Sequence, residues 1–140
     1  MSTTTLIVLL VAFKIKHFLA DYPLQGRYML GKFQSGWGFA LPLLSHVAVH
    51  ASFTFLLTCW FGILQAICLA LFDATSHFIM DRIKASPKYL GKYKPLTAET
   101  YPTATEVQIN SNKYYYWSLG FDQLIHHLSD LFIVIYLFLK

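Results

Sequence analysis

Charged residues are scarce in this 140-residue chain. They make up 13% of the sequence, against about 25% in typical soluble proteins. Hydrophobic residues make up 56%, and the mean hydropathy is +0.47. A soluble domain of this size has a large surface for its volume and needs charged side chains to cover it. The composition therefore argues against a soluble enzyme, a disordered tail and a nucleic-acid-binding domain.

Cysteine is scarce as well. Cys59 and Cys68 lie in apolar runs and have neither the spacing of a zinc finger nor that of a redox motif. We expect both to be small packing residues. The net charge of +4 is explained more simply by the basic loops of a membrane protein than by a nucleic-acid partner. Membrane lipids are the expected partners.

Long apolar runs, in contrast, fill most of the chain. They cover about residues 4–22, 39–59, 61–82 and 118–139. Each approaches the ~20 residues that a helix needs to cross a bilayer. Gly62 permits a tight turn between the second and third runs, which together are too long for one crossing. The sequence predicts an all-α, polytopic membrane protein, with residues 1–140 forming a single four-helix transmembrane bundle.

Basic residues predict the orientation of the bundle. Eight of them lie in or beside the connections that follow the first and third runs, whereas only Lys140 lies on the opposite side. The positive-inside rule then makes both connections cytoplasmic and both termini external. The connection at about 85–117 is too polar and too rich in proline to span, and we expect it to lie along the membrane surface.

Aspartate and histidine lie in the predicted spans, although an ionised aspartate at mid-bilayer costs roughly 3 kcal/mol. All five aspartates and all six histidines lie within or at the ends of these spans, while both glutamates lie in the loop. The spacing is regular and places partners four residues apart, on one helix face. The four sets are His17/Asp21, His46/His50, Asp73/His77/Asp81 and Asp122/His126. At 1.5 Å per residue all four sets reach one layer in the cytoplasmic half of the membrane.

Carboxylates so close together repel one another unless they are protonated or neutralised by a cation. Imidazole and carboxylate ligands without thiolate suit zinc, with manganese or iron as alternatives. We predict the metal ligands to be His46, His50, Asp73, His77, Asp81 and His126. Catalytic roles are predicted for His17, Asp21 and Asp122. A clamp for an anionic substrate group is predicted from Lys14, Arg27, Arg82 and Lys84, which also suit the role of membrane anchors.

Four segments carry a family resemblance: HFLADYPLQ at 17–25, LLSHVAVH at 43–50, SHFIMDRIK at 76–84 and FDQLIHHL at 121–128. In this order and spacing they resemble domain-of-unknown-function family 3307, small multi-pass membrane proteins of bacteria and phages. The resemblance covers most of the chain outside 85–115 and implies a protein of the bacterial inner membrane. It implies no reaction. A looser likeness is to intramembrane metal-dependent hydrolases.

Several functions suit this pattern. The first is a metal-dependent hydrolase acting on a lipid or another amphiphilic ester, amide or phosphoester. The second is a divalent-cation or proton-coupled transporter, which the apolar outer halves of the spans disfavour. A di-iron oxygenase and a non-catalytic membrane factor are further alternatives. In the last case the polar groups would only form hydrogen bonds with one another and stabilise the helix packing. A homo-oligomer is compatible with any of these functions.

Overall fold

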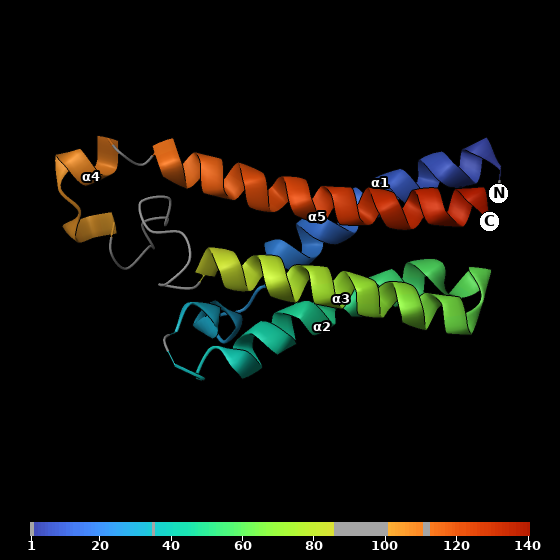
Figure 1. The fold of residues 1–140 in the computed structure, drawn as a ribbon, viewed down its shortest axis with the longest axis horizontal. Helices are drawn as coiled ribbons and strands as arrows, with labels where there is room; N and C mark the ends of the chain where they lie inside the picture. Colours follow the sequence, from blue (N-terminus) through green and yellow to red (C-terminus); the bar gives the residue numbers. More distant parts are fainter. Residues whose placement is uncertain (1, 35, 86–100, 111–112) are drawn as a thin grey trace.

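Four long helices form the protein. The computed structural model describes residues 2–34, 36–85, 101–110 and 113–140. The long helices are α1 (Thr3–Asp21), α2 (Ala40–Thr58), α3 (Ile63–Ala85) and α5 (Lys113–Leu139). Each contains, or forms with the turn that follows it, a segment long and apolar enough to cross a membrane, and the described ranges contain no strand. The predicted all-α, four-span fold is confirmed (Figure 1).

Short helical elements connect the spans. They are η1 (Met29–Phe33), η2 (Cys59–Phe61), η4 (Tyr101–Thr103) and α4 (Glu106–Asn110). Of the connection predicted at 85–117, residues 86–100 and 111–112 lie outside the described residues. Helix α5 begins within this connection, at Lys113, three residues before the apolar span that starts at Tyr116. The sequence of its first turns is rich in aromatic residues, as is common where a span enters the membrane.

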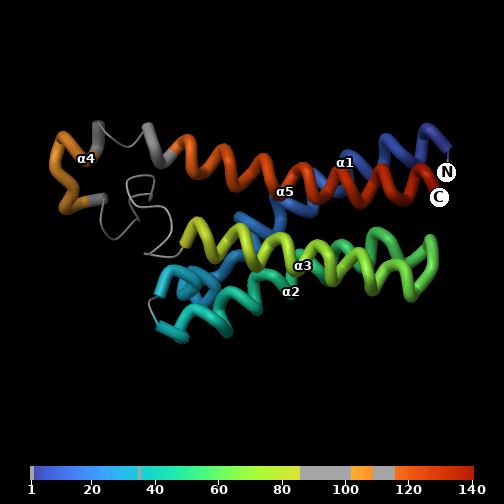
Figure 2. The backbone as a smooth tube through the Cα atoms, viewed as in Figure 1, coloured from blue at the N-terminus to red at the C-terminus, as the bar shows by residue number. Residues whose placement is uncertain are grey.

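The long helices form a closed ring. Helix α1 packs against α2, α2 against α3, α3 against α5, and α5 against α1. The backbone trace shows α1 beside α5 and α2 beside α3, with both chain termini at the same end (Figure 2). Each helix therefore turns one face toward a common interior.

Gly62 makes the turn between α2 and α3, as the sequence predicts. Its φ of +130° lies in a region that residues with a Cβ rarely adopt. Its N–H donates to the Cys59 carbonyl, and its own carbonyl accepts the first bond of α3, from Ala66. The turn lets two spans pack side by side with almost no connecting loop.

The bundle is polar inside and apolar outside. Among the described residues, 15 polar or charged side chains are buried, against 12 hydrophobic ones, and long aliphatic side chains cover the exterior. Trp37 and Trp60 lie near opposite ends of α2, and both are 87% exposed, as in the aromatic belts of membrane proteins. This distribution is that of a multi-pass membrane protein, since lipid solvates the apolar exterior.

An apolar core closes one part of the interior. It is formed by Leu9, Phe13, Leu69, Ile133, Val134 and Leu137. These residues come from the first half of α1, the first third of α3 and the last turns of α5, so the core lies toward the end with both termini. Most of the buried polar side chains lie toward the end that carries η1, while Thr54 and Thr58 of α2 reach the level of the core.

Candidate metal centre

The predicted i, i+4 pairs all face the interior. Their positions fall on the buried stripe of each helix, because a step of four keeps successive side chains on one face. Eight of the nine side chains are almost fully buried, and Asp21 is 15% exposed. The structure thus gathers His17, Asp21, His46, His50, Asp73, His77, Asp81, Asp122 and His126 in one polar cluster.

Asp21, at the end of α1, is the point on which three imidazoles converge. The Nε2 atoms of His17 and His50 lie 3.0 Å from its carboxylate oxygens, and that of His46 lies 3.3 Å away. Of these three contacts, only that of His50 has the geometry of a hydrogen bond. The Asp21 carboxylate has no lysine or arginine partner among the ion pairs of the described residues.

Beside this group the histidine rings lie close to one another, and one pair is stacked. The ring centroids of His50 and His77 are 3.9 Å apart, and those of His77 and His126 are 4.0 Å apart with an angle of 5° between the planes. His77 Nδ1 lies 3.1 Å from the Asp73 carbonyl, which can only accept. The Nδ1 atom therefore carries the proton, and the lone pair of the buried, unpartnered Nε2 is available to a ligand.

Lysines neutralise most of the other aspartates. Lys16 Nζ lies 2.8 Å from both Asp73 and Asp130, and the Thr54 hydroxyl donates to Asp73 at 2.6 Å. Asp73, predicted as a metal ligand, is therefore a counter-ion of Lys16 in this structure.

Two further lysines lie nearer the η1 end of the bundle. Lys32 Nζ in η1 lies 2.8 Å from Asp81, and Lys84 Nζ lies 2.6 Å from Asp122. Asp81 and Asp122 form a group with His126 whose ligand atoms lie within 4.8 Å of one another. Because each of these carboxylates has its own ammonium partner, the group carries little uncompensated charge.

The sequence did not predict Lys16, Lys32 and Asp130 as members of the cluster, and Lys32 was interpreted only as a topology signal. The signal for Lys16 was available: it lies on the stripe of α1 that also carries Leu9, Phe13 and Ala20. No comparable signal exists for Lys32, because η1 follows no apolar period. Its burial depends on how the loop folds back over the bundle end.

The interior carries an excess of negative charge. Among the described residues, five aspartates and three lysines face the interior, which gives a net charge of −2 when the histidines are neutral. Buried charges are costly unless they are paired, and a divalent cation would balance this excess. Among the described residues, Asp21 is the carboxylate without a lysine or arginine partner. The electrostatic field of the interior therefore favours binding of a cation beside it.

Many polar atoms of the cluster have no hydrogen-bond partner. They include seven imidazole nitrogens and one oxygen each of Asp73, Asp122 and Asp130. An unsatisfied buried polar atom costs about 1–3 kcal/mol. Imidazole nitrogens and carboxylate oxygens in such numbers are suited to binding a metal or ordered water rather than to holding helices together.

The donor geometry suits a tetrahedral metal. Asp21, His46 and His50 each offer a ligand atom within 4.8 Å of the others, and His50 also belongs to a second such group with His17 and His77. With metal–ligand bonds of about 2.0–2.1 Å, tetrahedral ligands lie about 3.3 Å apart. The contacts of 3.0 and 3.3 Å between the Asp21 carboxylate and the two imidazoles match that spacing.

The predicted anion clamp is dispersed. Lys84 alone contacts the polar cluster, through Asp122. Arg82 lies with its guanidinium carbon 3.4 Å from the centre of the Phe39 ring. Lys14 and Arg27 are exposed. The structure therefore does not bring these four residues together.

Comparison with known proteins gives a family and no closer relative. No curated protein matches the chain, and no solved structure does. One family model matches residues 6–140, which is nearly the whole sequence and includes every residue of the polar cluster. The chain therefore belongs to the family described as Protein of unknown function (DUF3307).

Proposed function

We propose that the protein is a metal-dependent hydrolase that acts on lipid-like substrates within the membrane. The observation that carries this proposal is the Asp21 carboxylate, on which histidine nitrogens from two helices converge and which has no ammonium partner among the described residues. Asp21, His46 and His50 are the proposed ligands. Three protein ligands with one open position are typical of catalytic zinc sites, and this nitrogen and oxygen set suits zinc, with manganese or iron as alternatives.

His17 is the proposed general base. Its Nε2 lies 3.0 Å from Asp21 and 3.1 Å from Gln123 Oε1, both of which can only accept, so Nε2 carries the proton and the buried, unpartnered Nδ1 is the basic nitrogen. Its ring lies among those of His50, His77 and His126. A metal held by Asp21, His46 and His50 would lower the pKa of a water molecule, and His17 would accept the proton as that water attacks the electrophilic carbon or phosphorus of the substrate. The same proton would then pass to the leaving group.

The apolar core favours hydrolysis over transport. Leu9, Phe13, Leu69, Ile133, Val134 and Leu137 fill the interior between the polar cluster and the end with the termini. A transported cation or proton would have to cross this layer, where the buried polar side chains of the described residues are the uncharged Thr54 and Thr58. A centre that is polar at one side and closed at the other suits a reaction at one face of the membrane.

We also propose the location. The distribution of basic residues supports a position of the polar cluster in the cytoplasmic half of the bacterial inner membrane, with both termini outside. The substrate would then be a lipid or another amphiphilic ester, amide or phosphoester present in that leaflet.

Metal content and turnover test the proposal together. The protein is purified in detergent with added zinc, freed of loose metal and assayed for zinc and for the hydrolysis of phospholipids in mixed micelles. About one zinc per chain is expected, together with hydrolysis that a chelator abolishes and zinc restores. The double variant His46→Ala/His50→Ala should lose both, while Ser45→Ala, in the same helix, should keep both.

Two other results would overturn the proposal. One is hydrolysis that is unaffected by the chelator and by the double variant. The other is zinc that moves across the membrane of protein-containing liposomes without any hydrolysis, which would favour a transporter. His17→Gln separates binding from chemistry, because it should keep zinc and lower the rate by about 10²- to 10⁴-fold.

A further inference from the structure

A groove runs along the lipid-facing seam between α1 and α5. Its volume is about 200 Å³, and its lining includes Leu10, Phe13 and Lys14 from α1 and His127, Asp130 and Val134 from α5. The groove is too small for a whole lipid but suits part of one extended chain.

The lining changes from polar to apolar along the groove. Helices α1 and α5 run in opposite directions, so Lys14 and His127 lie toward the η1 end, and Leu10 and Val134 lie toward the apolar core. A lipid in the leaflet next to the polar cluster has the same arrangement, with its polar group toward that surface and its chain toward the membrane centre. The order of polar and apolar residues along the groove therefore matches the order of headgroup and acyl chain in a lipid of that leaflet.

The polar end of the groove reaches the proposed centre. The ring centroids of His127 and His17 are 4.9 Å apart, and Asp130 Oδ2 lies 3.9 Å from His17 Nδ1. His17 in turn contacts Asp21. A group held at this end would lie one side chain away from the proposed general base.

Lys14 supplies a cation at the same end. Its side chain is exposed, and it takes part in none of the ion pairs of the described residues, unlike the buried Lys16 two positions later. Lys14 lies three residues before His17, and its exposed side chain can extend along the seam toward the headgroups, where the ammonium stays solvated and attracts phosphate.

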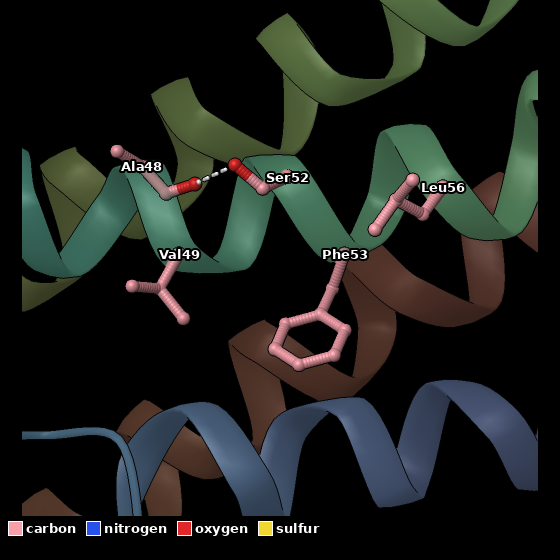
Figure 3. Close-up of a pocket in the computed structure, with 5 residues that line it drawn as sticks. All are labelled: Ala48, Val49, Ser52, Phe53 and Leu56. Carbon is pink, nitrogen blue, oxygen red and sulfur yellow. Dashed lines mark hydrogen bonds between the residues drawn. The ribbon is translucent and has the colours of Figure 1, made fainter.

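A second groove provides a comparison. It lies on α2, has a volume of about 270 Å³ and is lined by Ala48, Val49, Ser52, Phe53 and Leu56 (Figure 3). None of these residues is ionisable, and the Ser52 hydroxyl is already bonded to the Ala48 carbonyl at 2.7 Å. This groove could hold an acyl chain but offers nothing to a phosphate or an ester.

We propose that the groove between α1 and α5 binds an acyl chain of a phospholipid and admits its ester linkage sideways to His17. The inference rests on the proposed function and deepens it by assigning the substrate class, an acylated phospholipid, and the entry route. Lys14 binds the phosphate, and the aliphatic side chains of the seam bind the chain. Substrate thus enters from the lipid and not from the aqueous surface.

Photo-labelling tests the groove without requiring turnover. The protein is placed in vesicles of phosphatidylglycerol and phosphatidylethanolamine that contain a phosphatidylglycerol with a diazirine in one acyl chain, and labelled peptides are mapped by mass spectrometry. Leu131→Trp fills the groove between α1 and α5, and Leu56→Trp fills the groove on α2. Leu131 also lines the groove between α1 and α5. We expect Leu131→Trp to lower the labelling of 8–14 and 127–134 about fivefold, and Leu56→Trp to leave it unchanged.

The zinc content and the hydrolysis rate of the same variants separate the two proposals. Leu131→Trp should keep its zinc and lose most of its hydrolysis. Labelling that is spread evenly over the lipid-facing helices, or that Leu131→Trp does not reduce, overturns the groove even if zinc and hydrolysis are present. Labelling that behaves as expected in a protein without zinc overturns the hydrolase and leaves the acyl-chain groove standing.

Discussion

Lys16 is the residue on which the buried charge balance of the bundle depends most. Its ammonium is 1% exposed and is held between Asp73 and Asp130, each 2.8 Å away, on two other helices. Removing one partner from a buried ion pair costs more than the pair contributes, because the remaining charges stay buried without compensation. Here two carboxylates would be left rather than one.

Lys16→Met should therefore lower the free energy of unfolding by about 3–5 kcal/mol. Thermal unfolding in detergent, followed by circular dichroism, measures the change. Lys14→Met is the matched control and should have little effect on stability, because Lys14 is exposed. Adding Asp73→Asn and Asp130→Asn to Lys16→Met should recover much of the loss. Equal stability of the Lys16 and Lys14 variants would contradict this account of the charges.

The sequence was sufficient to predict which residues form the polar layer, but not which residues pair within it. Histidines and aspartates four residues apart were sufficient to predict the polar layer, since helical periodicity alone puts them on one face. The partners of each carboxylate were not predictable in the same way. Asp73 and Asp21 follow the same spacing rule, yet one faces Lys16 and the other faces three imidazoles, because the choice depends on the rotation of neighbouring helices.

At the level of elements, η1 is the part of the fold that hydropathy could not predict. The first connection folds back so that Lys32 is buried against Asp81, with Gln25 accepting a second bond at 3.0 Å. Close packing of η1 on the first turn of α2 makes this possible. A Cβ on Gly31 would lie 2.8 Å from Pro42 Cγ, which is closer than real contacts allow.

Gly31→Ala should displace η1 from α2 and weaken the contact between Lys32 and Asp81. We expect a loss of about 1–3 kcal/mol in stability, as is typical when a methyl group is forced into a packed site. Gly26→Ala is the control, since a Cβ there meets nothing within 4 Å. The unfolding midpoints of the two variants in detergent give the comparison. If both variants unfold like the parent protein, η1 does not depend on this close approach.

At the scale of the whole molecule, the four-span architecture was predictable because apolar length alone identifies transmembrane helices. The structure adds that both termini lie at one end (Figure 1) and that the apolar core lies toward that end. The basic residues predict that this end faces away from the cytoplasm.

Fusions at the C-terminus test this orientation. Alkaline phosphatase joined after Lys140 should be active, because the enzyme needs an oxidising compartment. Green fluorescent protein at the same position should stay dark when exported in unfolded form. The opposite pair of results would place the polar cluster in the outer leaflet and reverse the proposed side of the reaction.

The proposed function depends above all on the binding of a catalytic metal by Asp21, His46 and His50 inside the membrane. X-ray absorption at the zinc edge, on detergent-purified protein loaded with one equivalent of zinc, tests it most directly. We expect nitrogen and oxygen ligands at about 2.0–2.1 Å with the scattering pattern of two imidazoles. The double variant His46→Ala/His50→Ala should lose this pattern. Sulfur ligands from Cys59 or Cys68, or a spectrum of loosely bound zinc that the double variant does not change, would contradict it.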